Sequence, residues 1–129
     1  MKREIVKIKG IVPPPSPFNH VIRAGDFLFL SSQLSADLKV HKIIDGNISE
    51  QTKQALDNVK FLLETSGSSM ENVIKVVIYM RDKNDFDEMN KVYREYFREG
   101  EEPARVTVQA LSPIEKVDIE IEVTAIISD

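Results

Sequence analysis

The sequence predicts an α+β domain, in which a mixed β-sheet carries two α-helices packed on one face. Two observations lead to this fold class. Apolar or alternating segments of about four to eight residues, typical of strands, flank two longer segments whose apolar residues recur at helical spacing. The length of 129 residues suits one hydrophobic core. We therefore expect residues 1–129 to form a single domain with the element order β-β-α-β-α-β-β.

The composition excludes several classes of function. The chain contains no cysteine, so thiol redox catalysis, iron–sulfur clusters and zinc–thiolate sites are ruled out. Its 17 basic and 21 acidic residues are interspersed and give a net charge of −4, without the basic cluster of a nucleic-acid surface. No apolar run approaches the roughly 18 residues of a membrane span, and none resembles a signal peptide. We expect a cytoplasmic protein with no membrane or nucleic-acid partner.

The first part of the chain predicts short strands around a proline-rich loop. Residues 11–18 contain four prolines and cannot form a helix or a central strand, because proline has no N–H group to donate. Residues 27–30 are apolar without alternation, which is typical of a strand buried on both faces. The strands expected here are 3–8, 20–24, 26–33 and, more weakly, 38–44.

The middle of the chain predicts two helices on either side of a central strand at 73–80. Asn47 followed by Glu50 indicates a capping box, and Gly67 suits the position after the first helix. The second helix falls between residues 82 and 100, with acidic residues in its first turn and arginines in its last, as the helix dipole favours. The buried faces are expected to be Ile48, Ala55, Leu56, Val59, Leu62 and Leu63, then Phe86, Met89, Tyr93, Tyr96 and Phe97.

Two final strands, at 104–110 and 116–127, are expected to pair as a hairpin. The alternation of both strands favours a register in which Arg105 lies opposite Glu120. Their shared face is then exposed, since a two-layer fold leaves one side of the sheet uncovered. The other face, expected under the helices, contains Val106, Val108, Val117, Ile119, Ile121 and Val123.

The Arg105–Glu120 pair has two interpretations. It is either an ion pair on a solvated polar face or a site for a small anion, in which the planar guanidinium binds a carboxylate in bidentate fashion. In the second case the glutamate orients a water molecule or moves a proton. His20 and His41 are the only histidines, lie far apart in the sequence and lack further ligands, so no metal site is expected.

Short motifs along the chain match those of one known family. Residues 103–105 (Pro-Ala-Arg) and 119–122 (Ile-Glu-Ile-Glu) correspond to the two ends of its signature. Further matches lie at residues 45–46, 51–56, 57–60, 67–69, 73–75, 84–86, 90–93 and 96–97. From about residue 16 to 126, the chain thus resembles the reactive-intermediate deaminase (RidA/YjgF) family, whose members also carry the name endoribonuclease L-PSP.

The resemblance implies a chorismate-mutase-like fold and a homotrimer with sites at the subunit interfaces. It also implies hydrolysis of reactive 2-imino acids or their enamines to 2-oxo acids and ammonia, with no cofactor. Carried onto this chain, it makes Arg105 the residue that clamps the substrate carboxylate and Glu120 the residue that positions the water. The other implied substrate-binding residues are Phe18, Ser31, Ser32, Asn90 and Thr107.

Two departures from the family pattern concern the substrate. Phe18 stands where most deaminases have a tyrosine, so a hydroxyl group is missing, and Ser32 stands in place of the usual glycine. These changes indicate an altered preference or a reduced rate. The alternative function is a non-catalytic module that binds a small carboxylate or regulates a partner. RNA cleavage is disfavoured, because the chain has no catalytic histidine pair and no basic groove.

Overall fold

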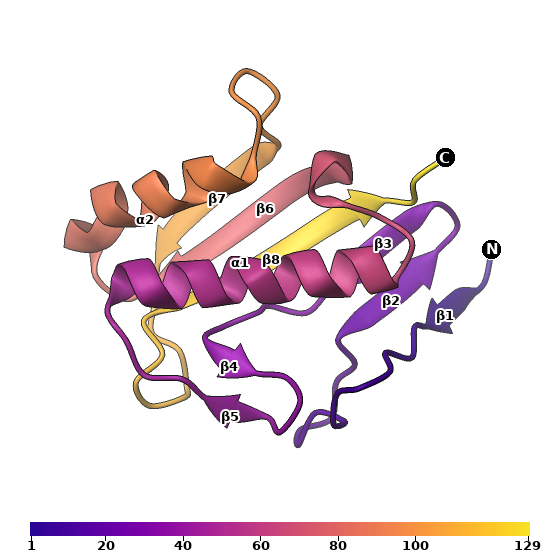
Figure 1. The fold of residues 1–129 in the computed structure, drawn as a ribbon, viewed down its shortest axis with the longest axis horizontal. Helices are drawn as coiled ribbons and strands as arrows, with labels where there is room; N and C mark the ends of the chain where they lie inside the picture. The colour runs from indigo at the N-terminus through magenta and orange to yellow at the C-terminus, as the bar shows by residue number, and fades with distance from the viewer.

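The computed structural model describes residues 1–129 as two layers, a six-stranded sheet and two helices that lie on the same face of it (Figure 1). All neighbouring strands are antiparallel except β6 and β7, which are parallel, so the predicted mixed sheet is confirmed. Across the sheet, the strands are β1 (Arg3–Ile5), β2 (Val21–Ala24), β3 (Phe27–Leu30), β8 (Ile119–Ile126), β6 (Val73–Met80) and β7 (Ala104–Gln109).

The remaining elements are the two helices and several short segments. The second helix is shorter than predicted, because 3₁₀ turns replace its first and last turns. Neither helix is long and apolar enough to cross a membrane. The elements are β4 (Ala36–Asp37), β5 (Lys42–Ile43), α1 (Ile48–Thr65), α2 (Phe86–Tyr93) and the 3₁₀ turns η1 (Met70–Asn72), η2 (Lys83–Asp85) and η3 (Arg94–Tyr96).

Local signals set both ends of α1. The predicted capping box is present: Asn47 Oδ1 accepts from the Glu50 backbone N–H at 2.9 Å, and Glu50 Oε1 accepts from the Asn47 backbone N–H at 3.0 Å. Gly67 follows the helix with a φ of 87°, a conformation that glycine adopts without strain. The apolar stripe of α1 is buried against the sheet, where it meets alternate residues of β6 and β8.

The predicted hairpin of the last two strands is wrong, because β6 lies between β7 and β8. The chain returns through α2 and places β7 parallel to β6 on its free edge, while β8 pairs with the other edge of β6. Arg105 is therefore opposite Val76, and Glu120 is opposite Tyr79. The two faces of β7 were predicted the wrong way round. Val106, expected under the helices, lies on the uncovered face and is 42% exposed.

The sheet face away from the helices is largely apolar, and we call it the open face. Residues 27–30 alternate here, contrary to the predicted burial on both sides: Leu28 and Leu30 are buried, whereas Phe27 and Phe29 are 42% and 46% exposed. Large apolar side chains exposed on this face belong to β3, β7 and β8, namely Phe27, Phe29, Val106, Val108 and Ile126.

Candidate functional site

Arg105 lies on the edge strand β7, on the face that α2 covers. Its Nη1 atom donates a hydrogen bond of 2.7 Å to Oδ1 of Asn90. The guanidinium carbon lies 4.8 Å from the centroid of the Tyr93 ring and 5.7 Å from that of Phe86, so both rings contact the cation. Residues of α2 thus hold the guanidinium in place, while its other N–H groups have no partner in the chain.

Two hydroxyl groups near Arg105 also lack hydrogen-bond partners. The Oγ1 atom of Thr107, two residues along the same face of β7, and the OH group of Tyr93 are both buried. Burial raises the pKa of Tyr93 to about 12, against the opposite effect of Arg105, so the phenol keeps its proton at neutral pH. These groups suit a carboxylate, which accepts hydrogen bonds only. We call Arg105, Asn90, Tyr93 and Thr107 the Arg105 group.

Glu120 lies on β8 and points to the open face, opposite Tyr79. Ser32, just after β3, donates a hydrogen bond of 2.6 Å from Oγ to Glu120 Oε1. Tyr79 donates to Glu122 Oε1 at 2.9 Å, and this hydrogen bond raises the pKa of the phenol. These side chains line a hollow of about 260 Å³ together with residues 110–113, so the carboxylate of Glu120 is within reach of a small ligand.

The proline-rich loop ends beside Ser32. Ser31 holds this loop through two hydrogen bonds, from its Oγ atom to the Asn19 carbonyl at 2.6 Å and from its N–H to the His20 carbonyl at 2.9 Å. Phe18 is 41% exposed and lies edge-on to the His20 ring, at 5.7 Å between centroids. We call Phe18, Ser31, Ser32 and Glu120 the Glu120 group.

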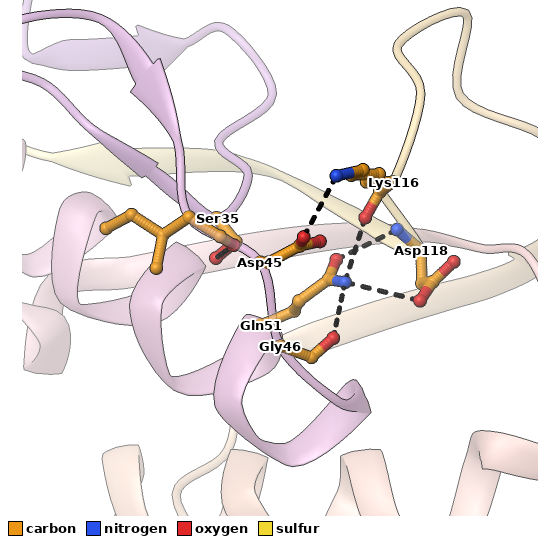
Figure 2. A network of polar contacts seen from close by, with 7 residues as sticks. Ser35, Asp45, Gly46, Gln51, Lys116 and Asp118 are labelled. Carbon is orange, nitrogen blue, oxygen red and sulfur yellow. Dashed lines mark hydrogen bonds and ion pairs between the residues drawn. The ribbon is translucent and has the colours of Figure 1, made fainter.

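The loop before β8 is fixed to the first turn of α1 by Gln51 (Figure 2). This side chain is buried, and its Nε2 atom donates to the Gly46 and Lys116 carbonyls at 3.0 Å each and to Asp118 Oδ2 at 3.2 Å. Its Oε1 atom accepts from the Asp118 backbone N–H at 2.9 Å. Lys116 also forms an exposed ion pair with Asp45 at 3.2 Å. Gln51 therefore positions the loop that borders the hollow at Glu120.

Arg105 and Glu120 lie on opposite faces of the sheet within one chain, so the predicted pairing across a hairpin is wrong. β7 and β8 are separated by two strand spacings, and the two residues are also offset by three positions along the strands. Their backbones are therefore about 14 Å apart. The predicted residues form two separate groups, and neither group alone contains both an anion-binding cation and a water-positioning carboxylate.

The candidate residues do not form a metal centre. No group of three or more histidine, aspartate or glutamate side chains is arranged to hold a metal ion. His20 and His41, distant in the sequence, do come together, because both line one cavity of about 100 Å³.

Comparison with known proteins identifies the family. The family model described as "Endoribonuclease L-PSP" matches residues 11–127. The chain belongs to the RidA/YjgF family. A RutC family protein from Pyrococcus horikoshii is 43% identical over 123 residues, which cover 95% of this chain and 97% of that protein. A 2-iminobutanoate/2-iminopropanoate deaminase from the mite Dermatophagoides farinae is 32% identical, with 88% of both chains covered.

Solved structures share the chorismate-mutase-like fold of this RidA/YjgF chain. Yeast Mmf1 superimposes with a TM-score of 0.89 at 32% identity, over 98% of this chain and 100% of that one. A Thermotoga maritima protein described as a "putative endoribonuclease" superimposes with a TM-score of 0.88 at 30% identity, over the full length of both chains.

Two features of this RidA/YjgF chain go beyond the sequence predictions. Tyr93 was expected only in the core, yet its ring also contacts Arg105. The available signal was its spacing of three residues from Asn90, which places both side chains on one face of α2. The cavity shared by His20 and His41 had no signal in the sequence, because it depends on how the proline-rich loop meets the β4–β5 segment.

Proposed function

We propose that this chain forms a homotrimer that hydrolyses reactive 2-imino acids, or their enamines, to 2-oxo acids and ammonia. Each site would combine the Arg105 group of one subunit with the Glu120 group of its neighbour. The observation that carries this proposal is the position of Arg105 and Glu120 on opposite faces of one sheet. One chain cannot bring both to a molecule as small as a 2-imino acid.

The open face supports assembly between copies of the chain. Its exposed phenylalanines and valines lose contact with water when another subunit covers them, which is favourable by about 25 cal/mol per Å² of apolar area. Glu120 lies on this face, whereas Arg105 lies on the edge strand β7. Packing of open faces around a threefold axis would bring the β7 edge of one subunit toward the open face of the next, where Glu120 lies.

The two groups supply complementary steps of the reaction. Arg105 binds the substrate carboxylate through its free N–H groups, and this holds the imine carbon beside the water on Glu120. Glu120 takes a proton from the water as the oxygen bonds to the imine carbon, and the imine nitrogen gains a proton, which gives a carbinolamine. The C–N bond then breaks: the nitrogen leaves as ammonia with one more proton, and the hydroxyl group loses its proton to become the 2-oxo group.

The reaction can be tested by generating 2-iminobutanoate enzymatically and following its loss with a trapping agent. Wild type should exceed the buffer rate. Arg105→Ala should lose turnover and also the affinity for 2-oxobutanoate, whereas Glu120→Gln should lose about 10²–10⁴ in rate while keeping that affinity. Arg98→Ala is the matched control, since Arg98 is an exposed arginine in surface ion pairs.

Two results would reject the deaminase function. One is a wild-type rate no higher than that of buffer, and the other is an Arg105→Ala rate equal to wild type. Saturable binding of 2-oxobutanoate without turnover would instead favour the alternative, a non-catalytic module that binds small carboxylates.

We also propose a cytoplasmic location for the protein.

A further inference from the structure

His20 and His41 line a cavity of about 100 Å³ together with Phe18. No aspartate, glutamate, lysine or arginine takes part in its lining, and apart from the histidines its polar residues are two serines and a glutamine. The apolar part of the wall is formed by Pro15, Phe18, Leu34, Ala36, Leu38, Ile43 and Ile114. This lining suits a neutral, mainly apolar group rather than an ion.

The hydrogen bonds around His20 determine which ring nitrogen carries the proton. Gln33 Nε2 donates to the Ser31 carbonyl at 3.1 Å, which fixes the orientation of the amide, and the same atom lies 3.3 Å from His20 Nδ1. Because an amide nitrogen only donates, Nδ1 accepts and the neutral ring has its proton on Nε2. Nε2 is buried without a partner, in a residue that is only 7% exposed.

The second histidine of the cavity lining also has an unpaired nitrogen. Nδ1 of His41 is buried and has no hydrogen-bond partner. Burial and the nearby His41 lower the pKa of His20, so that ring is neutral at pH 7. A hydroxyl group both accepts and donates, so it can accept from His20 Nε2–H and pair with either tautomer of His41. A methyl group of the same size would leave both nitrogens unpaired.

The cavity adjoins the proposed reaction site. Ser32 lines both this cavity and the hollow that contains Glu120, and its Oγ atom bonds to Glu120 Oε1. Phe18, also in the wall, belongs to the same group of residues. A substrate whose imine carbon lies at Glu120 would therefore extend its side chain past Ser32 toward the two histidines.

We propose that this cavity receives the substrate side chain and that His20 and His41 select a side chain ending in a hydroxyl group. The inference rests on the proposed function and names its substrate class, hydroxylated 2-imino acids. His20 and His41 act here as specificity residues and take no part in the bond-breaking steps.

The test compares two imines of nearly equal size, which an amino-acid oxidase generates from homoserine and from norvaline. They differ only in a terminal hydroxyl against a methyl group. Wild type should hydrolyse the homoserine imine with a kcat/KM at least about tenfold higher than that for the norvaline imine.

His20→Phe, which keeps a planar ring, should reduce this ratio of the two kcat/KM values to about one. His41→Gly should do the same, and its backbone φ of 55° suits glycine. Val40→Ala, an exposed neighbour outside the cavity wall, should retain the wild-type ratio.

The outcomes separate this inference from the deaminase proposal. Equal or faster hydrolysis of the norvaline imine by wild type overturns the selection, while deamination stands. An unchanged ratio in both His20→Phe and His41→Gly also overturns it. If no imine is hydrolysed, deamination fails, and calorimetry with 4-hydroxy-2-oxobutanoate and 2-oxopentanoate decides the inference. Tighter binding of the hydroxylated acid, lost in His41→Gly, supports the pocket, and equal binding rejects it.

Discussion

Ser32 donates a hydrogen bond of 2.6 Å to Glu120, a residue 88 positions away in the sequence. The bond joins the segment just after β3 to the start of β8 and occupies Oε1 of the carboxylate. Oε2 has no hydrogen bond within the chain, so it is the oxygen available to a water molecule. The orientation of the proposed base therefore depends on a serine that stands where the family usually has glycine.

Ser32→Ala should lower kcat for 2-iminobutanoate about tenfold, because the carboxylate loses the donor that orients it. Affinity for 2-oxobutanoate should change less than about twofold, since Arg105 provides the charge-assisted contacts. Steady-state kinetics and calorimetry measure the two effects. Ser49→Ala makes the same chemical change on the exposed side of α1 and should leave both values at wild type. A wild-type kcat in Ser32→Ala would show that this hydrogen bond does not matter for turnover.

Mixing two inactive variants should restore activity if each site is shared between subunits. When Arg105→Ala and Glu120→Gln chains are unfolded together and refolded at equal concentrations, about a quarter of the sites in random trimers combine an intact Arg105 with an intact Glu120. The mixture should therefore recover about a quarter of the wild-type turnover. Each variant refolded alone is the control. If the mixture is no more active than its components, the shared site is rejected. Either both residues then act within one subunit, or one of them takes no part in catalysis.

Gln51→Glu should destabilise the fold by about 2–4 kcal/mol. The substitution keeps the shape of the side chain but replaces its donor group with an oxygen, which cannot bond the two carbonyls and repels Asp118. Denaturant unfolding at pH 7 measures the loss. Gln109→Glu, in which an exposed amide bonds one carbonyl, should change the free energy of unfolding by less than about 0.5 kcal/mol. Equal losses in the two variants would contradict the role of Gln51.

Acid should destabilise the protein partly through His20. Burial, with a smaller effect of His41, lowers the pKa of His20 below its ordinary 6.5. Below about pH 6.5 the unfolded chain binds a proton that the folded chain does not. The free energy of unfolding therefore falls, by at most about 1.4 kcal/mol per pH unit, until the pH passes the lowered value. His20→Gln should remove this contribution, so its stability should depend less on pH between 7 and 5. Parallel pH profiles for the two proteins would contradict the assignment.

Much of the secondary structure could be predicted from the sequence because it rests on local chemistry. The capping box of Asn47 and Glu50, the glycine after α1 and the apolar spacing of its residues act within a few positions along the chain. These signals need no knowledge of strand order. The choice of Arg105 and Glu120 did need it, because it came from a predicted hairpin, which is wrong, and from the family resemblance.

Strand order and the faces of β7 could not be predicted from the sequence. Alternation shows which residues share a face, but not which face the helices cover. The rule that apolar residues lie under the helices fails for Val106 and Val108, which lie on the open face, and for Arg105 beneath α2. Insertion of β6 between β7 and β8 depends on long-range pairing. The tertiary structure alone therefore decided that Arg105 and Glu120 lie on opposite faces and that two distant histidines share one cavity.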